Sequence, residues 1–175
     1  MKPIEWRHDV RVLILGIIIL LNFILESTVF QYTRIFGVKP DFTIMLIVSY
    51  AIMRGSIYGG SIGLVSGFLN DLFYGKSFGV NSLSYMLTGY IIGQSQENIF
   101  KDSLIPSVFF NIVGIFIYQN LFYFISYLSK VDISYMYVLI NIIVPQSIYN
   151  GILGVIVYRY IYILDEKSFM DKKIY

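Results

Sequence analysis

The chain lacks several of the residues on which enzymes and metal sites depend. It has no cysteine, and its single histidine, His8, precedes the first apolar run. Disulfides, thiolate metal sites and thiol nucleophiles are therefore excluded, and a metal centre built on clustered ligands is not expected. A serine-based membrane protease has no base to use, because the apolar runs contain neither histidine nor lysine. The sequence predicts a protein that is not an enzyme and has no cofactor and no metal.

Charge is also scarce. Charged residues make up 14% of the 175-residue chain and hydrophobic residues 57%, whereas ordinary soluble domains carry about 25% charged residues. The net charge is +2 and the basic residues are scattered singly, without the clustered Lys/Arg stripe that nucleic-acid binding needs. The composition predicts one domain, 1–175, whose partner is the lipid bilayer and not nucleic acid.

Six apolar runs follow one another along the chain. In hydrocarbon a segment must satisfy its own backbone hydrogen bonds, so long apolar runs indicate helices. The shortest run, 41–53, is shorter than the roughly 20 residues of a membrane crossing, and runs of this length are as often re-entrant as spanning. We interpret it as a short second span. The first run has no small-residue cleavage site after it and is expected to be retained. The expected spans cover residues 10–30, 41–53, 55–75, 77–96, 103–128 and 133–158, and a charged tail covers 165–175.

The basic residues predict an orientation, because cytoplasmic loops retain positive charge. With six spans, one side of the membrane holds Lys2, Arg7, Arg11, Arg54, Lys101, Arg159, Lys167, Lys172 and Lys173. The other side holds only Arg34, Lys39, Lys76 and Lys130. This asymmetry predicts that both termini are cytoplasmic. Within the last span, Pro145 is expected to kink the helix because it removes one backbone donor.

Glycines recur every four residues in the third expected span, and two more in the fourth repeat the spacing once. Small residues at this interval let a neighbouring helix approach closely, which drives helix association in lipid. We interpret them as helix-packing residues, and a substrate path lined by glycine backbone is the alternative. The glycines concerned are Gly55, Gly59, Gly63, Gly67, Gly89 and Gly93.

Two carboxylates, Glu26 and Asp71, lie deep in apolar runs, where a charge costs about 2.5 to 3.5 kcal/mol at mid-bilayer. In the predicted orientation both lie at the depth of the outer leaflet, with Asn22 one helical turn below Glu26. They predict an outward-facing polar cluster or partner-docking site, and a structural hydrogen-bond network without a ligand is the alternative. Its expected counter-charges are Arg34, Lys39 or Lys76, and its expected members are Glu26, Asn70, Asp71, Gln119, Asn120 and Asn141.

Residues 39–94 contain three motif segments in close succession. Pro40-Asp41 opens a short apolar segment that ends near Arg54-Gly55. The stretch 59–75 has spaced glycines and ends in Asp71-Leu72 and then Gly75. Phe78-Gly79 then precedes two further segments, 84–87 and 89–93. Together these segments resemble the family of rod shape-determining proteins called MreD, which has a similar glycine-spaced helix that ends in Asp-Leu and then Gly.

The resemblance implies a fold and a function. The expected fold is an all-α integral membrane protein, a six-helix transmembrane bundle similar to the substrate-binding subunits of energy-coupling-factor transporters. The expected function is that of a non-enzymatic scaffold in the bacterial cytoplasmic membrane, which supports rod shape and lateral peptidoglycan synthesis in the elongation complex. Its expected partners are MreC and, through the complex, MreB, RodA and a transpeptidase. The alternative is a vitamin-type substrate-binding subunit of a membrane transporter.

Overall fold

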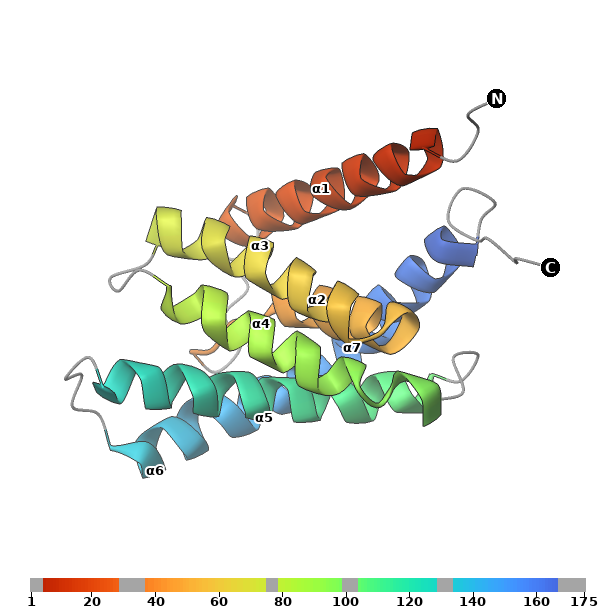
Figure 1. Ribbon diagram of the computed structural model, residues 1–175. Coiled ribbons are helices and arrows are strands. Elements are labelled where there is room, and N and C mark those ends of the chain that lie inside the picture. The colour runs from red at the N-terminus through yellow and green to blue at the C-terminus, as the bar shows by residue number, and fades with distance from the viewer. Residues whose placement is uncertain (1–4, 29–36, 75–78, 99–103, 129–133, 167–175) are drawn as a thin grey trace.

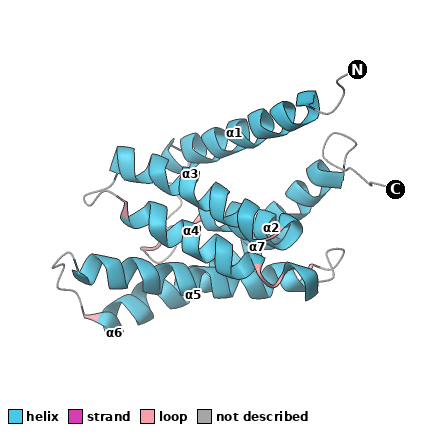
Figure 2. Cartoon of the chain, in the orientation of Figure 1, coloured by secondary structure: helices cyan, strands magenta, loops and turns pink. Residues whose placement is uncertain are grey.

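The structure is a computed structural model that describes residues 5–28, 37–74, 79–98, 104–128 and 134–166. Figure 2 shows helices joined by short loops and no strand in this part of the chain. The all-helical prediction is thus confirmed for the described residues, while residues 167–175 of the expected tail lie outside them. The helices are α1 (Glu5–Thr28), α2 (Phe42–Arg54), α3 (Ser56–Tyr74), α4 (Val80–Gly93), the 3-10 turn η1 (Gln96–Asn98), α5 (Ile105–Leu128), α6 (Tyr135–Val138), the π-helical turn η2 (Leu139–Ile143) and α7 (Val144–Glu166).

The helix formed by α6, η2 and α7 runs without a break and carries an irregular turn directly before Pro145. At this turn the Val144 N–H donates to the Leu139 carbonyl, five residues back instead of four. Pro145 has no backbone N–H of its own to donate. The structure therefore places the π-helical turn beside the residue for which a kink is expected.

Successive helices alternate in direction, so the chain passes back and forth along the bundle (Figure 1). The described beginning of α1 and the described end of α7 lie at the same end. The opposite end gathers the last turns of α1 and α3 and the beginnings of α4 and α6, whereas the shorter α2 begins nearer the middle of the bundle. We refer to that opposite end as the distal end.

Helix α2 forms the centre of the bundle. Every residue from Thr43 to Met53 is buried, because α1, α3, α4, α5 and α7 all pack against it. Its 13 residues rise about 20 Å, less than the roughly 30 Å of the hydrocarbon core. The run 41–53, which we expected to be a short second span, thus lies buried at the centre of the bundle. Asp41 starts it by accepting the Ile44 N–H.

Helices α3 and α4 make the closest contact in the bundle. A Cβ added at Gly59 or Gly63 would overlap the backbone of Gly89 or Tyr85, and one added at Gly67 would come within 2.5 Å of Ser82 Cα. The backbones touch at these points because no side chain separates them. The glycines spaced by four thus lie on the face of α3 that contacts α4.

The outer glycines of the two patterns lie at helix ends. Gly55 forms the one-residue turn between α2 and α3, with φ of 92°, a conformation that favours glycine. It therefore precedes α3 and is not part of that helix. Gly93 ends α4 against the backbone of Ser56, and Gly75 lies outside the described residues.

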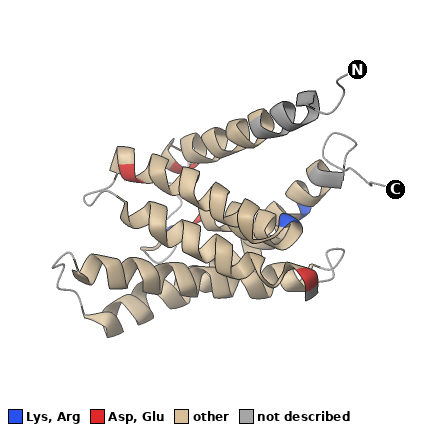
Figure 3. Ribbon diagram, viewed as in Figure 1, with Lys and Arg blue, Asp and Glu red and all other residues tan. Residues whose placement is uncertain are grey.

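The exterior of the bundle is apolar. Leucines and isoleucines face outward along α1, with Leu13 61% and Leu21 53% exposed, and tan helix faces dominate Figure 3, with charged residues towards the helix ends. Two described helices, Ile105–Leu128 and Tyr135–Leu164, are long and apolar enough to cross a membrane. An apolar surface of this extent is typical of proteins that face lipid, because soluble monomers rarely expose large apolar patches.

Candidate functional site

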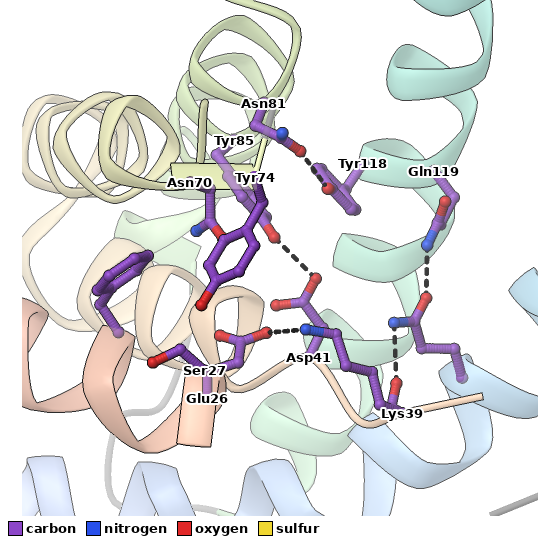
Figure 4. Close-up of a pocket in the computed structure, with 12 residues that line it drawn as sticks. Glu26, Ser27, Lys39, Asp41, Asn70, Tyr74, Asn81, Tyr85, Tyr118 and Gln119 are labelled. Atoms are coloured by element: carbon purple, nitrogen blue, oxygen red, sulfur yellow. Dashed lines mark hydrogen bonds and ion pairs between the residues drawn. The ribbon is translucent and has the colours of Figure 1, made fainter. Parts of the chain in front are cut away.

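A cavity of about 250 Å³ lies near the distal end of the bundle, where helices α1 to α5 and α7 meet. Its walls combine carboxylates, carboxamides, one lysine and several aromatic rings, which Figure 4 shows directed toward a common space. We call it the distal cavity. It is lined by Phe23, Glu26, Ser27, Lys39, Asp41, Asn70, Tyr74, Asn81, Tyr85, Tyr118, Gln119 and Gln146.

Glu26 enters the distal cavity from the last turn of α1. One of its oxygens accepts a hydrogen bond from Thr43 Oγ1 at 2.6 Å, and the other pairs with Lys39 Nζ at 3.4 Å. The Lys39 side chain is 44% exposed and that of Glu26 only 8%, so the ammonium approaches from the side of the solvent. Asn22 supports the arrangement by donating to Thr43 Oγ1 at 3.0 Å. Of the expected counter-charges, Lys39 pairs with Glu26, whereas Arg34 and Lys76 lie outside the described residues.

Asp41 is the second carboxylate of the distal cavity and is fixed from three helices. Its Oδ1 accepts the Ile44 N–H of α2 and its Oδ2 accepts the Tyr85 hydroxyl of α4, both at 2.9 Å. Asn150 of α7 accepts the Asp41 N–H at 3.0 Å and donates to the Asp41 carbonyl at 2.9 Å. Asp41 is buried and interacts electrostatically with both Glu26 and Lys39. The Asp41 carboxylate thus joins α2 to α4, and its backbone joins the same point to α7.

Two tyrosines form the wall opposite Lys39. The rings of Tyr85 and Tyr118 stack with centroids 4.2 Å apart and planes inclined by 2°. The Tyr118 hydroxyl donates to Asn81 Oδ1 at 2.9 Å (Figure 4). On the neighbouring wall Gln119 donates to Gln146, which donates to the Lys39 carbonyl at 3.1 Å. Polar contacts of this kind connect α5 and α7 to the segment that precedes α2.

Asp71 does not line the distal cavity, and its carboxylate accepts five hydrogen bonds. The N-cap residue of helix α4 is Gly79, which has no side chain to cap the first N–H groups of the helix. Asp71, in the last turn of α3, takes over this role, and the charge is favoured by the positive end of the α4 dipole. The five donors are the backbone N–H groups of Gly79, Asn81 and Ser82 and the side chains of Asn81 and Ser82, at 2.6 to 3.1 Å.

The residues expected to form a polar cluster are only partly brought together. Glu26, Asn70 and Gln119 line the distal cavity, and Asp71 is linked to it through Asn81. Glu26 and Asp71 therefore lie at the same end of the bundle without a direct contact in the structure.

The remaining two members face away from the cavity. Asn120 donates to the Phe116 carbonyl at 2.6 Å and accepts the Tyr135 hydroxyl at 2.8 Å, on the exposed side of α5. Asn141 is exposed and donates to the Tyr137 carbonyl of its own helix at 3.0 Å. Asn120 thus connects α5 to α6, whereas Asn141 bonds to its own helix.

Several residues that line the distal cavity were not predicted from the sequence. Asp41 carried a usable signal, because an acidic residue directly before an apolar run is a helix-cap pattern. Tyr85 and Tyr118 counted as apolar residues within uncharged runs, and Gln146 stood next to the expected kink. Among the described residues no group of three or more His, Cys, Asp and Glu side chains could hold a metal ion. The cavity offers hydrogen-bonding and charged groups for binding.

The helices and their apolar exterior define an all-helical membrane protein with a polar cavity near one end. The family model of the rod shape-determining protein MreD matches residues 7–167, and the chain belongs to this family. The resemblance stated from the sequence is thereby confirmed, together with a role in rod-shape determination. No curated protein and no solved structure gives a significant match, so the expected likeness to energy-coupling-factor subunits has no support from known structures.

Proposed function

We propose that the chain is a non-enzymatic component of the bacterial cell-elongation complex that supports lateral peptidoglycan synthesis by binding MreC. Through MreC it would join MreB, RodA and a transpeptidase. The observation that carries the proposal is the family match over residues 7–167, which spans all the helices from α2 to α7 and nearly all of α1.

The proposed topology has six spans in the cytoplasmic membrane with both termini in the cytoplasm. Helices of alternating direction support it, as does the placement of the described beginning of α1 and end of α7 at one end (Figure 1). Arg54 ends α2 at that same end, in agreement with the positive-inside rule. The distal cavity then lies toward the outer face.

In this proposal the two kinds of surface have separate roles. The hydrogen bonds of Asp41, Gln146 and Asn150 fix the register of α2, α4 and α7, which keeps the bundle in one arrangement. The exposed apolar faces of α1, α5 and α7 are available for contact with a transmembrane helix of MreC. Binding in lipid would then rest on helix packing.

The transporter alternative finds no support in the cavity. Its volume of about 250 Å³ is below the roughly 300 to 1,000 Å³ of pockets that hold drug-sized ligands. A vitamin-sized molecule needs a larger space, so the scaffold remains our proposal.

The proposal is tested by co-purification with MreC and by crosslinking. The chain has no cysteine, so single cysteines can be placed on exposed positions of three helices: Leu21→Cys on α1, Phe116→Cys on α5 and Ile152→Cys on α7. We expect at least one of them to crosslink to single-cysteine MreC in membranes. Ile47→Cys, which is fully buried, is the matched control and should give no product.

The proposal is wrong if tagged protein recovers no MreC and depletion leaves the cells rod-shaped. Recovery of a vitamin with the purified protein, together with loss of its uptake on depletion, would favour the transporter alternative instead.

A further inference from the structure

The wall of the distal cavity holds two carboxyl groups and one ammonium group. Among the described residues that line it, these are Glu26, Asp41 and Lys39. Both acids are buried, whereas the Lys39 side chain is 44% exposed. A cation that enters the cavity is therefore attracted by two carboxyl groups that have only one lysine between them.

Glu26 is the carboxylate whose hydrogen-bond acceptor sites are only partly used. A carboxylate has roughly four lone-pair sites, and Glu26 accepts one bond from Thr43 and one long, 3.4 Å contact from Lys39. It stands in the last turn of α1, where the helix dipole disfavours an acid. A buried acid in this position benefits from a cation that is closer than Lys39 and shielded from water.

The wall chemistry favours an organic cation over a metal ion. The described residues include no group of three or more His, Cys, Asp and Glu side chains that could hold a metal ion, whereas a calcium site uses six to eight oxygen ligands. Tyr74, Tyr85 and Tyr118 line the cavity beside the acids, and aromatic faces attract ammonium groups. At about 250 Å³, with roughly 30 Å³ per water, the space has room for about eight water-sized groups, which suits a small polar molecule.

We propose that the distal cavity binds the ammonium end of a small zwitterion. The ammonium lies between Glu26 and Asp41, and Lys39, released from Glu26, pairs with the anionic group of the ligand at the mouth. Phosphoethanolamine has this chemistry, either as the headgroup of a phospholipid or as the free molecule. The inference goes beyond the proposed function and does not depend on MreC binding, which the co-purification measures separately.

The test uses the full chain purified in detergent and native mass spectrometry. The protein is offered phosphatidylethanolamine or its N-acetylated form with the same acyl chains, and free phosphoethanolamine in a separate arm. Acetylation removes the positive charge that the carboxylates bind, so it should weaken binding at least about tenfold. Selective retention of the lipid alone assigns the ligand to the membrane, and binding of the free molecule shows that the headgroup suffices. Equal retention of acetylated and unmodified lipid, without binding of the free molecule, would overturn the proposal.

Variants tie the binding to the cavity. Glu26→Gln keeps an oxygen for the Thr43 hydroxyl but removes the charge, and we expect its affinity for the amine to fall about tenfold or more. Glu97→Gln is the matched control, since Glu97 is an exposed carboxylate in η1, outside the cavity, and its affinity should be unchanged. A Glu26→Gln protein that shows the unfolding temperature of the original chain and also binds the amine as tightly would contradict the proposal.

Discussion

Asp71 and Glu26 are both carboxylates in the last turn of their helices, α3 and α1, yet their surroundings differ. Asp71 accepts five hydrogen bonds at the beginning of α4, whereas Glu26 accepts one from a hydroxyl and one from a half-exposed lysine. Both are buried. The difference separates a charge that holds the fold together from a charge that remains able to exchange its partner.

The helices that carry the two acids differ in the same way. Around Asp71, glycines bring α3 and α4 into backbone contact, so little can move without a clash. Helix α1, which carries Glu26, has open space at Gly16, where an added Cβ meets nothing within 4 Å. We infer that the α3–α4 pair is the rigid part of the bundle and that α1 is held more loosely.

The largest expected effect is that of Asp71→Leu. This change leaves five donors without their acceptor, and each unsatisfied buried donor costs about 1 to 3 kcal/mol, so we expect a loss of more than about 3 kcal/mol even after relaxation. The measurement is the yield of monodisperse protein in detergent, followed by thermal unfolding. Glu97→Leu, at an exposed carboxylate, is the control and should keep its yield. Equal yields for the two variants would contradict the claim that the Asp71 carboxylate stabilises the fold.

A smaller loss is expected for Gly63→Ala. The new methyl group overlaps the backbone of Tyr85, and overpacking of this kind costs about 1 to 3 kcal/mol. Gly16→Ala is the control, because its methyl group meets open space and alanine favours the helix by roughly 0.5 to 1 kcal/mol. Thermal unfolding of both variants measures the difference, and an equal response would show that α3 and α4 are not packed more tightly than α1.

Tyr85→Phe should have a moderate effect. It removes the hydroxyl that donates to Asp41 Oδ2, and a hydrogen bond to a charged group contributes about 1.5 to 3 kcal/mol. Tyr90→Phe, on the exposed face of α4, is the matched control. If the two variants unfold at the same temperature, Asp41 does not depend on α4 for its position.

The smallest effect is expected for Asn141→Ala. Its side chain is exposed and bonds only to the carbonyl of Tyr137 one turn earlier, and surface substitutions usually change stability by less than about 0.5 kcal/mol. Its folded yield and its retention of the amine should equal those of the original chain. Loss of amine binding in this variant would extend the site beyond the distal cavity.

The sequence predicted the helical fold well because its signals are local. Apolar runs and glycines spaced by four depend only on neighbouring residues, and a charge in an apolar run draws attention by itself, as with Glu26 and Asp71. The sequence did not indicate that the other helices surround α2, because the composition of a short apolar run does not reveal which neighbours pack against it.

The rest of the site depends on contacts between distant residues. Asn150 forms hydrogen bonds with Asp41, from which it is separated by 109 positions in the sequence. Gln146 donates to the Lys39 carbonyl across a separation of 107 positions. Neither pair has a spacing that a single sequence reveals. Asn141 shows the converse, because a polar residue in an apolar run can also form its hydrogen bond within its own helix.

The most direct test of the comparison replaces each acid by its uncharged isostere, Asp71→Asn and Glu26→Gln, and follows thermal unfolding of the purified proteins in the same detergent. Asp71→Asn puts a donor amide among five donors, so we expect its unfolding temperature to fall by several degrees. Glu26→Gln keeps the Thr43 hydrogen bond, and its unfolding temperature should stay close to that of the original chain. Equal losses, or a greater loss for Glu26→Gln, would contradict the assignment of the fixed charge to Asp71 and the exchangeable charge to Glu26.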